Sequence, residues 1–196
     1  MTDSELVALA RDIDAICRLT GEFVLRSGQV SDEYFDKYLF ETDPVMLRRV
    51  AERMVDLVPD DVDLLGGLEL GGIPLVTMLS SLTGIPALFV RKEAKTYGTR
   101  RLAEGAATTG RRVLLVEDVI TTGGAVRNAA RALRAGGATV ETVVCAIDRS
   151  EPGTDPFARD RIAIRAVLTE DLLDLVTSRD GNGLVTPPGV RLGPRP

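Results

Sequence analysis

The residues best suited to chemistry lie between positions 113 and 124, in the stretch VLLVEDVITTGG. An apolar run ends there in two acids, Glu117 and Asp118, and a Thr/Gly turn follows at 121–124. A turn that leads from a strand into a helix presents backbone N–H groups, and these bind phosphate with help from the helix dipole. Carboxylates just upstream are placed to accept hydrogen bonds from sugar hydroxyls. The stretch therefore predicts a site for a ribose 5-phosphate group.

Two absent motifs narrow this prediction. The chain has neither the GxxxxGK[ST] sequence of a nucleotide-binding P-loop nor a GxGxxG dinucleotide turn, so a monophosphate is expected rather than a nucleoside polyphosphate. A plainer interpretation of Glu117 and Asp118 stays open, because the dipole of a helix favours acids at its N-terminus without any ligand.

Two other polar segments also follow short apolar runs: ELGGIP at 69–74 and VRKEAK at 90–95. Ligands of open parallel sheets bind beyond the carboxyl ends of the strands, so we expect these segments to meet 117–124 at one edge. Residues 91–110 are polar, basic and interrupted by glycine. A loop this long is typical of a mobile functional loop, and a solvated surface hairpin is the alternative.

The rest of the chain predicts the scaffold. Apolar residues at helical spacing indicate a helix from Asp3 to Leu19 that ends at Gly21. Short strands around a Ser/Gly turn follow over 22–38, and Asp43 then caps a helix that begins with a proline.

From residue 63 onward, continuous apolar strands alternate with helices. This alternation is typical of an α/β fold in which a central, mostly parallel sheet is flanked by helices. A short helix is expected near 170–176, and the Gly/Pro-rich end predicts an extended tail over 177–196. We therefore expect a single domain over 1–176.

Composition excludes several classes of function. The chain has 196 residues, a formal charge of −5 and a pI near 4.9, which disfavours nucleic-acid binding through a basic face. It contains no histidine, which removes Ser-His and Cys-His catalysis and most zinc sites. Cys17 and Cys145 lack metal-ligand spacing and are expected to be buried, reduced thiols. The acidic N-terminus is unlike a signal peptide and no apolar run approaches the ~20 residues of a membrane span, so we expect a cytoplasmic protein without membrane contact.

Several segments together resemble a known family. The stretch VLLVEDVITTGG resembles the 5-phosphoribosyl 1-pyrophosphate (PRPP) motif of type I phosphoribosyltransferases. In chain order, FVLRSGQVSDEYFD resembles the N-terminal hood segment of orotate phosphoribosyltransferases, LELGGIPL their pyrophosphate loop, VRKEAKTYGTRRLAEG their mobile catalytic loop, and AIDR the segment that carries a base-binding arginine. The likeness covers roughly residues 20 to 150. It implies the type I phosphoribosyltransferase fold, with a small hood over 1–42 and a mobile loop over 91–110.

The resemblance also implies roles for residues. Glu117 and Asp118 would hold the ribose 2′- and 3′-hydroxyls, and Lys95 and Asp118 would be catalytic. The implied PRPP-binding residues are Glu117, Asp118, Val119, Ile120, Thr121, Thr122, Gly123, Gly124, Arg91, Lys92, Lys95, Tyr97, Leu70 and Gly71. The implied orotate-binding residues are Arg26, Phe35, Thr121 and Arg149.

Mg²⁺ is the implied cofactor, held mainly by PRPP and water rather than directly by a side chain, as this ion prefers. The resemblance further implies a homodimer in which Lys92 and Lys95 of the mobile loop reach the neighbouring subunit's site.

Three positions depart from the family pattern. Arg26 stands where many members have a lysine, and Tyr97 stands where the mobile loop often has a histidine. The family often has a lysine where this chain has Gly71 or Gly72, although other members resemble this chain. For Arg149, a surface position after a strand is the alternative to a role in orotate binding.

The activity implied is orotate phosphoribosyl transfer, in which orotate and Mg-PRPP give orotidine 5′-monophosphate and pyrophosphate. One alternative is the same reaction on another base. Another is a PRPP-sensing regulator that binds nucleic acid, which the acidic net charge disfavours. The set Arg91, Lys92 and Lys95 favours catalysis, because a sensor does not need a catalytic lid.

Overall fold

The computed structural model describes residues 3–25, 28–93 and 102–179. Its helices are α1 (Asp3–Cys17), α2 (Tyr38–Thr42), α3 (Pro44–Val55), α4 (Gly72–Thr83), α5 (Gly124–Ala135) and α6 (Glu170–Arg179). Its strands are β1 (Arg18–Val24), β2 (Val30–Phe35), β3 (Leu64–Leu68), β4 (Ala87–Val90), β5 (Ala103–Gly105), β6 (Val113–Ile120), β7 (Thr142–Asp148) and β8 (Ala163–Thr169).

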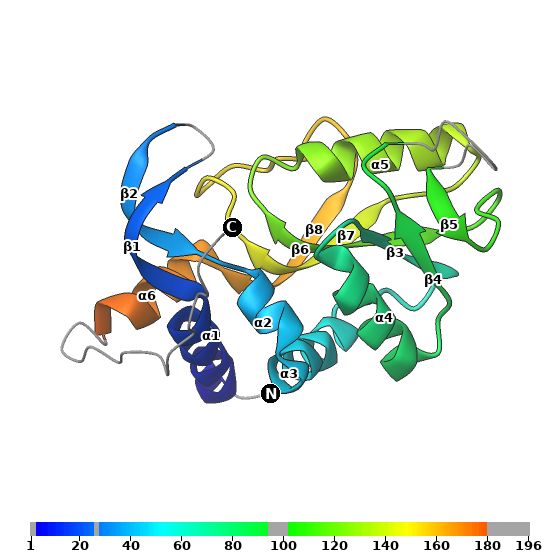
Figure 1. The fold of residues 1–196 in the computed structure, drawn as a ribbon. Helices are drawn as coiled ribbons and strands as arrows, with labels where there is room; N and C mark the ends of the chain where they lie inside the picture. Colours follow the sequence, from blue (N-terminus) through cyan, green and yellow to red (C-terminus); the bar gives the residue numbers. More distant parts are fainter. Residues whose placement is uncertain (1–2, 26–27, 94–101, 180–196) are drawn as a thin grey trace, which may run out of the picture.

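The centre of the molecule is a six-stranded sheet with the order β5-β4-β3-β6-β7-β8 (Figure 1). Strands β4, β3, β6, β7 and β8 are parallel, and only β5 is antiparallel to its neighbour β4. All five residues of β3 are buried, as expected of a parallel strand covered on both faces. The predicted α/β fold with a mostly parallel sheet is confirmed.

Helices cover both faces of this sheet and create two apolar cores. One core joins α1, α3, α4 and α6 to the strands, and the other lies under α5, which Figure 1 shows on the opposite face. Helix α3 begins as predicted, because the Asp43 carboxylate accepts hydrogen bonds from the N–H groups of Val45 and Met46 at 2.9 Å each.

The hood contains a two-stranded antiparallel hairpin, β1-β2, that stands beside the main sheet (Figure 1). The predicted helix end was wrong: α1 ends at Cys17, and Gly21 lies inside β1. The reason is tertiary, since Arg18 already pairs with Phe35 of β2 and leaves no room for another helical turn.

Two predicted boundaries can be compared with the structure. Within the predicted loop 91–110, residues 103–105 form β5, which pairs antiparallel with β4; residues 94–101 lie outside the described residues, so the mobile loop stays a prediction. The boundary placed at residue 176 falls inside α6. The Thr177 hydroxyl lies 3.0 Å from an Asp14 carboxylate oxygen, so the helix is tied to α1 beyond that boundary.

The strand order fixes where a ligand can bind. The chain passes from β3 to β4 on one side and then to β6 on the other side of β3. The crevice at the carboxyl ends of β3 and β6 is therefore a topological switch point, where open α/β sheets bind ligands. In the described ranges, no helix is long and apolar enough to cross a membrane.

Candidate active site

The two acids of the PRPP-like stretch lie buried at the end of β6. Glu117 is 8% exposed and Asp118 is 1% exposed. The Asp118 N–H donates to Glu117 Oε1 at 3.1 Å, and the Val119 N–H donates to Asp118 Oδ1 at 2.5 Å. Burial followed by the neighbouring Asp118 raises the pKa of Glu117 well above its ordinary value. Both acids therefore belong to strand β6 and do not lie at the N-terminus of a helix.

Two residues that the sequence did not point to complete this acidic cluster. Lys37, which directly precedes α2, places Nζ 2.5 Å from Asp118 Oδ2. Burial alone would raise the pKa of Asp118, but hydrogen bonds with Glu117 and Lys37 outweigh it and hold that pKa below its usual range. Glu41 of α2 is 4% exposed, and burial followed by a hydrogen bond with Asp118 raises its pKa to about 8.

Gly71 of the pyrophosphate-like loop lies against the same cluster. A Cβ atom at this position would be 1.6 Å from Asp118 Oδ2 and 2.6 Å from Glu41 Oε1. Only glycine fits, so the loop after β3 and the acids near the end of β6 touch across the switch point. Leu70, the neighbouring candidate, is 64% exposed.

The Thr/Gly turn at 121–124, the predicted phosphate cradle, leads from β6 into the start of α5. Thr121 and Thr122 are exposed, and Gly123 has a left-handed conformation with φ of 69° as the N-cap. Arg127, on the first turns of α5, donates to the carbonyls of Thr122 and Pro156 at 2.9 Å each. This clamp, which the sequence did not indicate, ties the turn to α5 and to the segment at Pro156.

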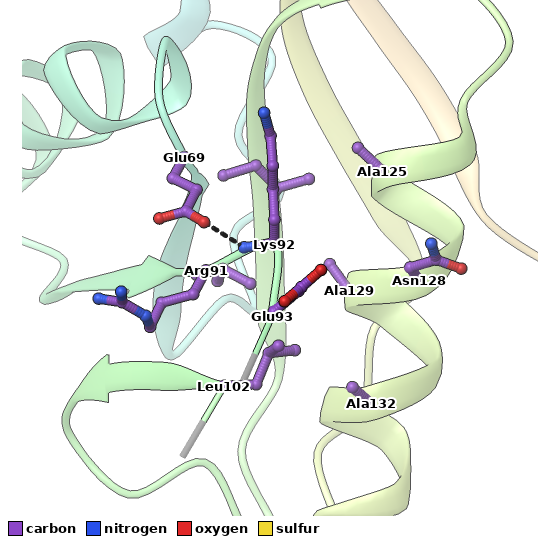
Figure 2. Close-up of a pocket in the computed structure, with 11 residues that line it drawn as sticks. Glu69, Arg91, Lys92, Glu93, Leu102, Ala125, Asn128, Ala129 and Ala132 are labelled. Atoms are coloured by element: carbon purple, nitrogen blue, oxygen red, sulfur yellow. Dashed lines mark hydrogen bonds between the residues drawn. The ribbon is translucent and has the colours of Figure 1, made fainter. Parts of the chain in front are cut away.

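The basic residues of the second polar segment line a cavity of about 700 Å³ between the ends of β3 and β4 and one side of α5 (Figure 2). The Lys92 N–H donates to a Glu69 carboxylate oxygen at 2.6 Å. In Figure 2 the Arg91 and Lys92 side chains extend in different directions from the same strand end. Asp118 does not line this cavity, so these cations and the acidic cluster occupy different parts of the sheet edge.

The candidates for the base lie on the other side of the cradle. The backbone N–H of Arg149 donates to the Ile120 carbonyl at 2.7 Å, and this hydrogen bond places Arg149 beside Thr121. Its guanidinium lies 5.2 Å from the centre of the Phe35 ring and donates two hydrogen bonds to the Glu170 carboxylate. The structure thus brings Phe35, Thr121 and Arg149 to one end of the cradle, with Glu170 as an unforeseen partner. Arg26, Lys95 and Tyr97 lie outside the described residues.

Both cysteines are free and buried, as predicted. Burial raises the pKa of Cys17 to about 12, and that of Cys145 well above its ordinary value. Neither thiol is therefore suited to nucleophilic chemistry.

In chemical terms, the arrangement joins three functions at one edge. Buried carboxylates accept hydrogen bonds from hydroxyls, the α5 N-terminus accepts a phosphate, and Arg149 over Phe35 suits a planar anion. Within the ranges that the structure describes, no three acids or cysteines are grouped to hold a metal ion by themselves.

Comparisons with known proteins agree with this arrangement. The family model of the phosphoribosyl transferase domain matches residues 43–163. An orotate phosphoribosyltransferase of a Nocardioides species is 68% identical over 166 residues, which are 85% of this chain and 93% of that protein. The orotate phosphoribosyltransferase of Halobacterium salinarum is 41% identical over 171 residues, or 87% and 96% of the two chains.

Solved structures give the same result. The Mycobacterium tuberculosis orotate phosphoribosyltransferase in complex with Fe(III) dicitrate superposes with a TM-score of 0.76 at 32% identity, covering 86% of this chain and 98% of the other. A structure of the same enzyme in complex with PRPP superposes with a TM-score of 0.71 at 28% identity, covering 87% and 99%.

Proposed function

The chain belongs to the orotate phosphoribosyltransferase family, and from this premise we propose that it transfers the 5-phosphoribosyl group of PRPP to orotate. The products are orotidine 5′-monophosphate and pyrophosphate. The observation that carries the proposal is the junction at Ile120: the acidic pair precedes it, the predicted phosphate cradle follows it, and the backbone N–H of Arg149 donates to its carbonyl at 2.7 Å, which brings the Arg149 residue to the same place. A ribose phosphate and a planar anionic base fit side by side at such a junction.

The ribose phosphate end of the substrate is assigned to β6 and α5. Glu117 and Asp118 accept hydrogen bonds from the ribose hydroxyls, and the backbone from Thr121 to Gly124 binds the 5′-phosphate. The left-handed Gly123 and the clamp from Arg127 support this assignment, because a turn of this kind at a helix N-terminus leaves backbone N–H groups available to an anion.

The base is assigned to the hood side of the cradle. Phe35 packs on one face of the Arg149 guanidinium, and Arg149 forms an ion pair with the orotate carboxylate, for which its planar fork is suited. In the structure Glu170 accepts two hydrogen bonds from that fork, so orotate must share Arg149 with Glu170 or displace it. Arg26 is kept as a second candidate cation.

The chemistry needs charge stabilisation more than acid–base catalysis. As pyrophosphate leaves C1 of the ribose, positive charge develops on the sugar and negative charge on the leaving group. Arg91, Lys92 and Lys95 are proposed to stabilise the leaving group, and the buried carboxylates face the sugar. Orotate carries an acidic ring nitrogen, so no histidine is required as a base.

Mg²⁺ fits this site as a companion of the substrate. Among the described residues no group of acids or cysteines is suited to hold a metal ion, and Mg²⁺ commonly keeps several waters and binds substrate phosphates. We therefore assign the ion mainly to PRPP oxygens and water, where it would neutralise the developing charge of pyrophosphate. The shared-site homodimer, with Lys92 and Lys95 acting across the interface, and the cytoplasmic location stay predictions.

One assay tests the activity. Orotate absorbance is followed with PRPP and Mg²⁺, and the same protein is offered a panel of purines and other pyrimidines. We expect loss of orotate absorbance only with both PRPP and Mg²⁺ present, with formation of pyrophosphate. Turnover of a different base without turnover of orotate would refute the assignment, and PRPP binding without any turnover would favour the regulator.

A further inference from the structure

The hood reaches into the acidic cluster through two side chains that the assigned reaction does not yet use. Lys37 and Glu41 both contact Asp118, although they lie far from it in the sequence. Asp118 is the residue that is assigned to the ribose hydroxyls. Its surroundings therefore decide how well it accepts them.

Lys37 is the positive charge of this cluster. Its ammonium lies 2.5 Å from Asp118 Oδ2, and a third of its side chain is exposed whereas Asp118 is 1% exposed. Burial lowers the pKa of Lys37, but the hydrogen bond and charge of Asp118 outweigh it and raise that pKa. A charged Lys37 thus stands between the buried acids and the open side. Without it, the carboxyl groups would face an anionic substrate unopposed.

Glu41 is the second acid beside the same carboxylate. Glu41 Oε1 is buried without a hydrogen-bond partner, and it lies 2.6 Å from the point where a Gly71 Cβ would stand, while Asp118 Oδ2 lies 1.6 Å from that point. Two buried carboxyl groups that share so small a space are stable when one of them is protonated. Glu41 is the better acid to hold the proton, because Asp118 already faces Lys37.

The pyrophosphate-like loop cannot bring its own cation to this place. A lysine at position 71 would need a Cβ atom 1.6 Å from Asp118 Oδ2. Lys37 instead reaches the same oxygen from the hood.

We propose that Lys37 and protonated Glu41 are positioning residues that hold the Asp118 carboxylate for the ribose hydroxyls of PRPP, and that Lys37 is the positive charge which position 71 cannot carry. This inference rests on the proposed function. It makes the hood part of the PRPP site as well as of the base site.

Kinetics of Lys37 variants test the first half. Lys37→Met should raise the KM for PRPP by roughly 30-fold or more, as expected when one partner of a buried charge pair is truncated, while the KM for orotate stays within twofold. Lys37→Arg should restore most of the loss. Arg48→Met is the matched control, because it removes a positive charge from an exposed pair with Glu52 on α3 and should change neither constant.

The pH dependence of PRPP binding tests the second half. Besides Asp118 and Lys37, the groups that act on Glu41 include Asp36, and Glu41 in turn acts on Cys17 at the end of α1. The Cys17 thiol stays neutral because burial raises its pKa to about 12. Ionisation of Glu41 above pH 8 should therefore weaken PRPP binding several-fold, measured by calorimetry with Mg-PRPP and no orotate.

Glu41→Gln keeps a hydrogen-bond donor without the titration, so its PRPP affinity should match the wild type at pH 7 and stay flat to pH 9. Glu41→Ala should bind PRPP weakly at every pH. Unchanged PRPP constants in Lys37→Met, or the same pH dependence in Glu41→Gln as in the wild type, would overturn the inference, even if both variants lost thermal stability. If the wild type binds PRPP but does not turn over orotate, the proposed function is refuted. The PRPP-binding measurements would then still decide whether Lys37 and Glu41 position Asp118.

Discussion

Replacing Gly71 with alanine is the sharpest test of the site geometry. Gly71 has φ of −66° and ψ of −28°, a conformation open to any residue, so the substitution introduces volume without backbone strain. The new Cβ would lie 1.6 Å from Asp118 Oδ2 and 2.5 Å from Asp118 Cγ, whereas ordinary contacts begin at 3.4 Å. Asp118 must therefore move by nearly 2 Å from its present position.

The size of the effect follows from this displacement. A catalytic group that is misplaced by ~1 Å can cost ~100-fold in rate. We therefore expect the kcat/KM for PRPP to fall at least ~100-fold, equivalent to about 2.7 kcal/mol of transition-state stabilisation. Overpacking at a buried position should also lower the free energy of unfolding by ~1–3 kcal/mol.

The assay is PRPP-dependent loss of orotate absorbance, together with thermal unfolding of each variant. Gly84→Ala is the matched control: Gly84 has φ of 74°, and nothing lies within 4 Å of its added Cβ. It should lose ~1–2 kcal/mol of stability through left-handed strain and keep full activity. A Gly71→Ala variant whose kcat/KM stays within threefold of the wild type would show that Asp118 is not where the reasoning requires it.

Three further predictions concern single residues. Lys95→Ala should lower kcat by ~100-fold, as for loss of one charge-stabilising donor, while the calorimetric dissociation constant of PRPP changes far less; unchanged turnover would remove Lys95 from the mechanism. Arg149→Ala should raise the KM for orotate by about 10- to 100-fold, since charge-assisted hydrogen bonds contribute ~1.5–3 kcal/mol, and an equal rise in the KM for PRPP would contradict its assignment to the base. Because the pKa of Glu41 rises from 4.5 to about 8 on folding, its contribution to stability is complete below pH 4.5 and is lost as the pH rises through 8. Denaturant unfolding should show this loss in the wild type as the pH rises from 4.5 to about 8, but not in Glu41→Gln.

The sequence by itself determined the elements and the chemistry of the cradle. Apolar strands alternating with helices fixed the parallel sheet, because such runs are stable only when both faces are covered. The order of strand, acids and Thr/Gly turn in 113–124 fixed a phosphate site at the start of α5, since this depends on local backbone groups. The role of Asp43 as a helix cap could be predicted from the sequence too, because capping depends on residues that are close along the chain.

Contacts between distant segments were decided only by the tertiary structure. No motif identifies the roles of Lys37, Glu41 and Glu170. Lys37 and Glu41 matter because the hood brings them to Asp118, and Glu170 matters because β7 and β8 are neighbours, which brings it to Arg149. The end of α1 likewise depended on the pairing of Arg18 with Phe35. The pKa of Asp118 depends on its contacts with Lys37 and Glu41. These effects cannot be predicted from the sequence, because desolvation and Coulomb interactions depend on distance and burial and not on sequence separation.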